Sequence, residues 1–231
     1  MIYYDFHIHS CLSPCADDDM SANNIIGMAY IKGLDYIAIT DHNSCLNAKA
    51  FKDNELPVKV LYGIEVETQE EVHILGLFLD LDKNQEFGKW VNEYLPDVKN
   101  DPTFFGNQII VNEKDEEIGR FDKLLLQSIS KSIDEVIDKI HELKGAAVLA
   151  HALDRKNSIT FQLGFIPEGI KADAIEVKSV EEINKLKKMH PYLEDYLFIV
   201  DSDAHHLTDI SEKDNQLSSL ELERLLRPCK T

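Results

Sequence analysis

Short apolar runs recur along the chain, and most of them lead directly into histidine or carboxylate side chains. Such runs, rich in β-branched and aromatic residues and bounded by polar segments, predict buried β-strands. The seven runs span residues 2–8, 34–40, 58–66, 72–79, 146–150, 174–177 and 197–200. Any fold of this chain must therefore bury these runs and also accommodate the charged side chains that follow them.

Amphipathic segments separate several of these runs. A helix is expected over residues 22–32, after the N-cap candidate Ser21, and another after the capping box formed by Ser132 and Glu135. Further helices are expected over 180–190 and 218–226. Alternating strands and helices predict an α/β fold with a parallel sheet buried on both faces. Seven strands with this rhythm favour a TIM-like barrel over an open sheet.

Residues 84–120 interrupt this rhythm with Pro96, Pro102 and several charges. We interpret them as an insertion or lid, and residues 1–231 as a single domain. A chain of 231 residues with 44% hydrophobic side chains can bury one large core. No glycine-rich fingerprint opens a helix, so a dinucleotide-binding function is unsupported.

The charge balance limits the classes of partner. Lys and Arg number 24 against 42 Asp and Glu, a formal net charge of -18. This charge disfavours long nucleic acid and anionic lipid, because both repel a negative surface. No apolar run approaches the length of a membrane span, and no secretory leader is evident, so we expect no membrane partner and a cytoplasmic location. The four cysteines, Cys11, Cys15, Cys45 and Cys229, are expected to be reduced thiols.

Potential metal ligands gather at the ends of the predicted strands. His7 and His9 are two residues apart on a strand, so both side chains can face one cation, although such a pair alone is better explained as two surface or strand-end histidines. The pattern recurs at other strands, in His42, Glu65, His73, His151, Asp203 and His205. Burying so many imidazoles and carboxylates together is costly unless cations compensate them. The sequence therefore predicts a metal site on the rim where βα barrels assemble their active sites.

The mixture of nitrogen and oxygen ligands suits Mn, Zn or Fe better than Ca. The ligands exceed what one ion can use, so we expect two to three divalent ions bridged by carboxylate. Such closely spaced ions stabilise the attacking and leaving oxygens of phosphoryl transfer and lower the pKa of a bound water.

The ordered motifs resemble the PHP (polymerase and histidinol phosphatase) family. The matching segments are HIHS at 7–10, ITDHNS at 39–44, GIEVET at 63–68, VHILGL at 72–77, AH at 150–151 and SDAH at 202–205. The resemblance implies a distorted seven-stranded (β/α)7 barrel that hydrolyses phosphoesters through a trinuclear metal centre and a metal-bound hydroxide. It is closest to the stand-alone phosphoesterase branch of the family.

The resemblance also implies how the ligands are shared. His7 and His9 would hold the first ion with Glu65 and Asp203, and Glu65 would bridge to a second ion held by His73 and His151. His42 and His205 would hold a third ion with an acid of the first loop, for which Asp17 is the candidate and Asp18 and Asp19 are alternatives. Glu65 and Asp203 are the candidate catalytic residues. Cys11 and Cys15 lie in the same loop, but the family pattern calls for no thiolate.

A small phosphorylated substrate, such as a nucleotide or sugar phosphate, is expected. Arg155 is the best candidate to bind its phosphate, because the planar guanidinium matches phosphate oxygens in pairs, although a solvated loop charge explains it nearly as well. Three alternatives stay open: a metal-dependent amidohydrolase, a non-catalytic metal-binding module of the same family, and an exonuclease acting on a short oligonucleotide end. The sequence leaves the oligomeric state open.

Overall fold

The computed structural model describes residues 1–52 and 57–226, so Cys229 lies outside the described residues. The strands are β1 Ile2–Ile8, β2 Tyr36–Ile39, β3 Lys59–Glu67, β4 His73–Phe78, β5 Ile109–Val111, β6 Glu117–Arg120, β7 Ala146–Leu149, β8 Ala174–Val177, β9 Leu197–Val200 and β10 Gln216–Leu217. The α-helices are α1 Ala22–Ile31, α2 Leu81–Tyr94, α3 Pro102–Phe105, α4 Ile133–Glu142, α5 Ile159–Leu163, α6 Val180–Met189 and α7 Ser219–Leu226. Short 3-10 helices span Leu46–Phe51, Pro191–Leu193 and Leu207–Asp209.

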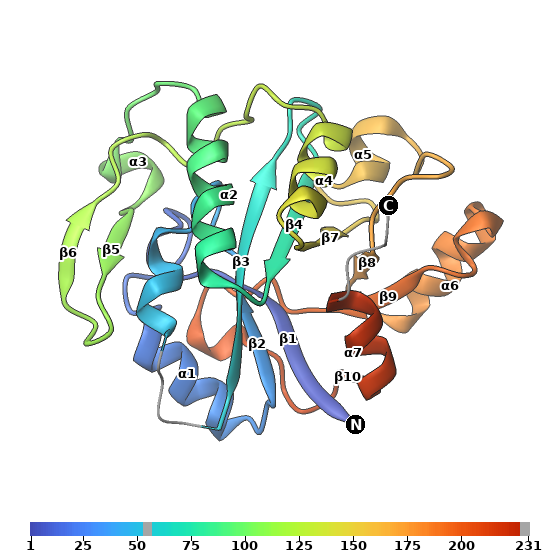
Figure 1. Cartoon of the computed structure of the whole chain (residues 1–231), viewed down its shortest axis with the longest axis horizontal. Coiled ribbons are helices and arrows are strands. Elements are labelled where there is room, and N and C mark those ends of the chain that lie inside the picture. Colours follow the sequence, from blue (N-terminus) through green and yellow to red (C-terminus); the bar gives the residue numbers. More distant parts are fainter. Residues whose placement is uncertain (53–56, 227–231) are drawn as a thin grey trace.

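The principal sheet has eight strands in the order β10-β1-β2-β3-β4-β7-β8-β9 (Figure 1). The seven predicted strands all form, each within a few residues of its predicted bounds. The eighth, β10, pairs antiparallel with β1 through only two residues. So short a strand carries no periodicity, and for this reason the expected count of seven was too low.

The sheet is mixed, and the expectation of a wholly parallel sheet was wrong at β4. This strand pairs antiparallel with both β3 and β7. Only residues 68–72 connect β3 to β4, and a parallel pairing would need a much longer crossover. Because β4 runs in the opposite direction, its first residue, His73, lies at the edge where the neighbouring parallel strands end.

The sheet curls into a half-barrel. Beyond β9, Ala204 forms a parallel bridge with Ile8 at the end of β1. The His9 amide donates to the Ala204 carbonyl at 2.9 Å, and the Ala204 amide donates to the His7 carbonyl at 3.1 Å. The expected α/β class is confirmed, whereas the strands themselves do not close into a regular seven-stranded barrel. The segment after β9 makes the contact that brings the end of β1 next to this side of the sheet.

Successive side chains along β3 point to opposite faces of the sheet, and this alternation places apolar residues in the core and Glu65 at the polar edge. Ile64 and Val66 point into an apolar cluster shared with α2 and α4, which pack against β3, β4 and β7. Leu61 belongs to a second cluster, built mainly from strand residues and α7. Glu65 has the same parity as Leu61 and continues that face beyond the apolar residues. A third cluster lies under α1.

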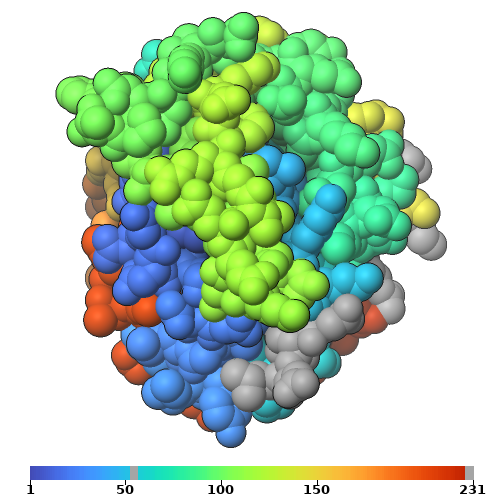
Figure 2. Space-filling view, turned by 90° about the vertical axis from the view of Figure 1, so that its left-hand side faces the viewer, coloured from blue at the N-terminus to red at the C-terminus, as the bar shows by residue number. Residues whose placement is uncertain are grey.

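Residues 84–120 form most of α2, all of α3 and the β5–β6 hairpin, which is a separate two-stranded sheet. The Ile109 amide donates to the Cys11 carbonyl at 2.9 Å, so the hairpin is attached to the first loop. Figure 2 shows its yellow-green residues crossing one face of the molecule, beside the blue N-terminal residues. Their role as an insertion or lid, and the single-domain organisation, stay predictions. No helix among residues 1–52 and 57–226 has the length and hydrophobicity that crossing a membrane requires.

Candidate metal centre

All the candidate ligands except Asp17 converge at one edge of the curled sheet. They come from β1, β3 and β4 and from the turns that follow β1, β2, β7 and β9. Among the residues that the structure describes, three groups have ligand atoms that all lie within 4.8 Å of one another. These groups are His7, His9 and Asp203; His42, Glu65 and His73; and His9, His42 and His205.

Glu65 lies at the centre of this cluster and is 1% exposed. Its two carboxylate oxygens contact the imidazoles of five histidines. The Oε1 atom lies 2.7 Å from His73 Nδ1, 3.2 Å from His151 Nε2 and 3.3 Å from His7 Nε2. The Oε2 atom lies 3.0 Å from His42 Nδ1 and 3.4 Å from His9 Nε2. One carboxylate therefore faces separate sets of histidines with its two oxygens, as a bridging ligand must.

His7 and His9 face each other, with their Nε2 atoms 3.2 Å apart. Asp203 Oδ1 lies 3.4 Å from His7 Nε2 and 3.3 Å from His9 Nε2. The outer nitrogens are held by other residues: His7 Nδ1 lies 2.8 Å from Glu176 Oε2, and His9 Nδ1 lies 3.0 Å from Ser13 Oγ. These contacts fix each ring so that Nε2 faces the cluster.

Sequence reasoning missed Glu176 and Ser13, the two residues that contact the outer nitrogens of His7 and His9. Glu176 is a single carboxylate inside the buried strand β8, and this isolated charge was the available signal. Ser13 donates a hydrogen bond to Asp41 Oδ1 at 2.7 Å, and Asp41 also accepts one from Ser10. Asp41 thus positions the first loop from outside the cluster, whereas its neighbour His42 lies within the cluster.

The pKa values of neighbouring histidines in the cluster are shifted in opposite directions. Burial raises the pKa of Glu65, but the positive charges of His73, His7 and His42 outweigh burial and hold this pKa well below its ordinary value. Burial lowers the pKa of His7, yet Glu176 and Glu65 outweigh it and raise that pKa well above the ordinary value. The pKa of His9 is lowered by burial and by the charges of His42 and His205. The cluster therefore contains both the ionised carboxylate and the neutral imidazole that metal binding requires.

Two of the candidate ligands have left-handed backbone conformations. The φ angle is 29° at His151 and 56° at Asp203, a region that non-glycine residues rarely adopt. Both residues follow the ends of buried strands. Such conformations persist where the surrounding structure determines them, and they are concentrated at functional sites.

Unpaired polar atoms indicate that the cluster fits metal ions. Glu65 Oε2 is buried and accepts no well-formed hydrogen bond, and His151 Nδ1 is also buried without a partner. His73 Nδ1 and His151 Nε2 lie 3.2 Å apart, as do the facing nitrogens of His7 and His9. Converging lone pairs of this kind repel unless a proton or a cation lies between them. Mixed imidazole and carboxylate ligands suit divalent transition metals.

Asp17 does not join the cluster. Its Oδ2 lies 2.6 Å from His206 Nδ1, and both side chains are more than half exposed. Asp18, one of the two alternatives, accepts a hydrogen bond from Asn107 Nδ2 at 2.8 Å. The placement of these acids therefore does not support the expectation that Asp17 completes the third site. Burial raises the pKa of the Cys15 thiol, but the influence of His42 and His205 outweighs burial and lowers this pKa to about 6.

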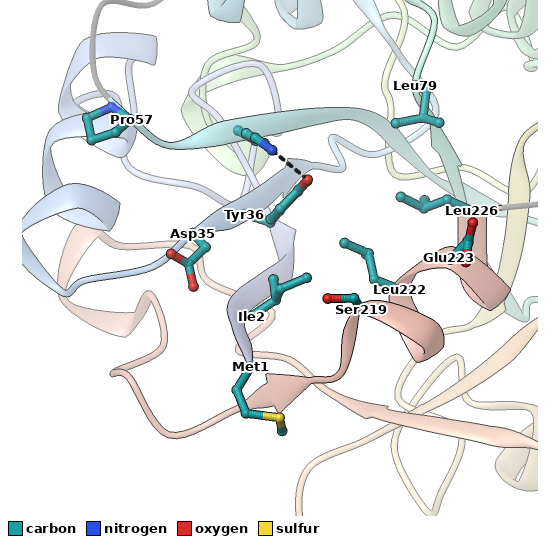
Figure 3. Close-up of a pocket in the computed structure, with 11 residues that line it drawn as sticks. Met1, Ile2, Asp35, Tyr36, Pro57, Leu79, Ser219, Leu222, Glu223 and Leu226 are labelled. Atoms are coloured by element: carbon teal, nitrogen blue, oxygen red, sulfur yellow. Dashed lines mark hydrogen bonds between the residues drawn. The ribbon is translucent and has the colours of Figure 1, made fainter.

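A cavity of about 250 Å³ opens beside the cluster, and Arg155 lines it together with Lys156 and Asn157. Arg155 Nη1 donates to Asp203 Oδ2 at 3.1 Å, so its guanidinium lies next to a candidate ligand. A second hollow, of about 770 Å³, is lined by residues of β1, β2 and α7, including Ile2, Tyr36 and Leu222 (Figure 3). Among the described residues, none of the groups of potential metal ligands lies at this second hollow.

Comparison with known proteins identifies relatives of this fold. The PHP domain model matches residues 5–163. A 5′-3′ exoribonuclease from Haemophilus influenzae is 29% identical over 82 residues, which are 33% of this chain and 29% of that protein. The chain matches about half or less of the length of its curated relatives.

Two solved structures share the fold at low sequence identity. The lesion-specific endonuclease Q from Pyrococcus furiosus is 18% identical with a TM-score of 0.66, covering 99% of this chain and 56% of that one. A candidate metal-dependent phosphoesterase from Bifidobacterium adolescentis is 17% identical with a TM-score of 0.63, covering 96% of this chain and 95% of that one. Endonuclease Q has also been solved with a 27-mer duplex. A protein that contains this fold is thus bound to a long duplex, which conflicts with the expectation that long nucleic acid is unlikely.

Proposed function

The chain belongs to the PHP domain family, and from this premise we propose that it is a metal-dependent phosphoesterase. The observation that carries the proposal is the contact of one buried carboxylate, Glu65, with five imidazoles beside a cavity lined by Arg155. A cluster of this composition is suited to two or three Mn, Zn or Fe ions. Endonuclease Q and the Bifidobacterium protein support the fold on which the proposal rests.

The ligands are assigned as follows. The first ion would be held by His7, His9, Glu65 and Asp203, the second by Glu65, His73 and His151, and the third by His42 and His205 with a residue of the first loop. Divalent ions bound there would polarise a phosphoryl group and activate water for attack at neutral pH.

The protein's own residues position these groups and the substrate. Glu176 and Ser13 orient the rings of His7 and His9, so that neither imidazole needs to reorganise during the reaction. Arg155 borders the cavity, where its guanidinium would bind phosphoryl oxygens while it remains near Asp203. The cavity of about 250 Å³ favours a small phosphorylated compound, such as a nucleotide or sugar phosphate.

Phosphate release from a panel of phosphoesters tests the proposal. The protein is stripped with chelator, reloaded with Mn, Zn or Fe, and assayed on sugar phosphates and on nucleoside mono- and bisphosphates. We expect phosphate release that requires metal and is lost in Glu65→Gln. A metal-loaded protein that releases ammonia from amides instead is an amidohydrolase. One that turns over no substrate is a non-catalytic module, and either result contradicts the proposal.

A nuclease is the second candidate function. Two comparisons favour it, because one relative is a 5′-3′ exoribonuclease and a protein of the same fold is an endonuclease. The shared chemistry is phosphodiester hydrolysis, so the panel also includes 5′-phosphorylated oligonucleotides of RNA and DNA. Release of mononucleotides from one end would identify an exonuclease, whereas internal cleavage of a duplex would identify an endonuclease.

A further inference from the structure

Asn157 brings a side-chain amide to the cavity beside the cluster. It lines this cavity of about 250 Å³ together with Arg155 and Lys156, and only 8% of the residue is exposed. Within residues 1–52 and 57–226 its side-chain amide forms no hydrogen bond, and neither of the two amide atoms is among the fully buried polar atoms that lack a partner. Solvent therefore reaches the amide, and because the rest of the residue is buried, it does so through the cavity.

The backbone holds this residue in place. The Asn157 carbonyl accepts a hydrogen bond from the His73 amide at 2.9 Å, which attaches the loop to the first residue of β4. The loop is also bonded to itself: the Ser158 amide donates to the Arg155 carbonyl at 2.9 Å, and the Arg155 amide donates to Ser158 Oγ at 3.2 Å. A side chain on a loop fixed in this way is preorganised for binding, because little conformational entropy remains to be lost.

The backbone conformation offers a competing reason for asparagine at this position. The φ angle of Asn157 is 64°, in the left-handed region, which asparagine adopts more readily than most residues and glycine more readily still. Asp154 in the same loop is also left-handed, with a φ of 52°, but its carboxylate forms an ion pair with Lys185. Conformation thus explains the residue type at 157, but it does not explain an unpaired amide at the cavity.

The hydrogen-bonding groups of the amide indicate what it would bind. An asparagine side chain supplies donors at Nδ2 and an acceptor at Oδ1. The oxygens of an ionised phosphate only accept, and Arg155 and Lys156 already offer donors to them at this cavity. An alcohol both donates and accepts, so it can use both atoms of the amide. Because Asn157 and Arg155 are two residues apart on one loop, such a hydroxyl would lie close to the bound phosphate.

From this arrangement we propose that Asn157 is a specificity-determining residue that recognises a free hydroxyl group in the organic part of the substrate, next to the phosphoester. The inference rests on the proposed function, because it assumes that phosphoesters bind in this cavity. The substrate class is then a phosphoester of a polyol, such as a sugar phosphate or a ribonucleotide, in preference to its deoxygenated counterpart. A site that hydrogen-bonds a hydroxyl rejects the analogue that lacks it, because the polar groups of the site are left unpaired.

Pairs of substrates that differ by one hydroxyl test the inference. The pairs are ribonucleoside 5′-monophosphates with their 2′- and 3′-deoxy counterparts, and glycerol phosphate with propyl phosphate. We expect the metal-loaded parent to prefer the hydroxylated member of at least one pair by about tenfold or more in kcat/KM. Asn157→Gly keeps the left-handed backbone but removes the amide. It should lower kcat/KM for the hydroxylated member to the level of its partner and leave the partner's value unchanged. Metal content should be that of the parent, because the carbonyl that accepts from His73 is retained.

Lys144→Gly is the matched control. Lys144 also has a left-handed φ, of 61°, but it is exposed after α4 and does not line the cavity, so the substitution should leave the preference of the parent unchanged. Thermal unfolding of both variants verifies that they are folded.

The possible outcomes separate this inference from the proposed function. If Asn157→Gly keeps the preference, or if the parent distinguishes the members of no pair, the inference fails and the proposed function stands. Equal losses on both members together with a loss of metal would show that Asn157 acts through His73, and a lost preference among nucleobases would assign the amide to the base; either result overturns the inference. If the parent releases phosphate from no substrate, the proposed function fails and the inference fails with it.

Discussion

Glu65 is the residue on which the cluster depends most. Its oxygens contact five imidazoles, so Glu65→Gln removes the charge that all of them share while it keeps the shape of the side chain. We expect the variant to lose two equivalents of metal together and to lose more activity than His42→Ala, which removes a ligand of one ion. Elemental analysis and phosphate release measure the two effects. A loss of one equivalent, with activity like that of His42→Ala, would show that Glu65 does not bridge.

Arg155 is expected to act on substrate rather than on metal. Arg155→Ala should lower kcat/KM by about tenfold or more, the size of one lost charge-assisted hydrogen bond to phosphate, and leave metal content unchanged. Arg155→Lys is the matched variant, which keeps the charge but loses paired recognition and should recover only part of the activity. Unaltered kinetics of Arg155→Ala would contradict this role and would indicate that Arg155 is a solvated loop charge.

Individual ligand residues could be predicted from the sequence only where they lie in strands or directly after strands. His7, His9, His42 and Glu65 follow from strand ends and motif order, because the backbone there has few alternatives. The first loop is different: its acids are adjacent in sequence, and the contacts that orient them come from His206 and Asn107, which are remote. The spacing of residues in the sequence does not indicate those contacts.

At the scale of elements, the predicted capping box of α4 is confirmed, and it leads to a prediction of how stability depends on pH. Hydrogen bonds from Lys131 and Ser132 lower the pKa of Glu135 from 4.5 to about 2. Because the pKa of Glu135 is lower in the folded state than in the unfolded state, the ionised carboxylate stabilises the folded protein at pH values above about 4.5. This stabilisation is lost as the pH falls from about 4.5 towards 2. The stability difference between the parent and Glu135→Gln, measured by urea unfolding, should therefore be largest near pH 7 and shrink below pH 4.5.

Asp134→Asn is the control for this experiment. It removes an exposed carboxylate from the same helical turn but leaves the capping box intact. Its stability difference from the parent should be smaller at pH 7 than that of Glu135→Gln. A difference for Glu135→Gln that is the same at every pH would contradict the assignment of the cap.

Gly63 lets β2 and β3 approach each other beside the cluster. A Cβ atom there would lie 2.6 Å from Thr40 Cγ2 and 2.7 Å from the Ile39 carbonyl oxygen. Gly63→Ala should therefore destabilise the protein by about 1–3 kcal/mol, because backbone has to move. Gly27→Ala is the matched control: no atom lies within 4 Å of its Cβ position in α1, so it should be stabilising by up to about 1 kcal/mol. Thermal or urea unfolding compares the two, and equal stabilities would contradict the close approach.

At the scale of the whole molecule, alternating strands and helices predicted the α/β class but not how the sheet closes. The hairpin from β3 to β4 reverses one strand, and the Ile8–Ala204 bridge connects the end of β1 to the segment after β9. Both depend on loop length and on contacts between distant segments, which periodicity does not encode. Reversal of β4 nevertheless brings His73 to the edge shared by the other ligands, so the predicted cluster survives the error in topology.

The central claim is that this edge of the sheet is a multinuclear metal centre. Elemental analysis of protein purified without chelator tests it most directly, by counting Mn, Fe and Zn per chain. We predict a total of two to three equivalents, reduced by the ligand substitutions described above. A total at background for all three metals would contradict the claim.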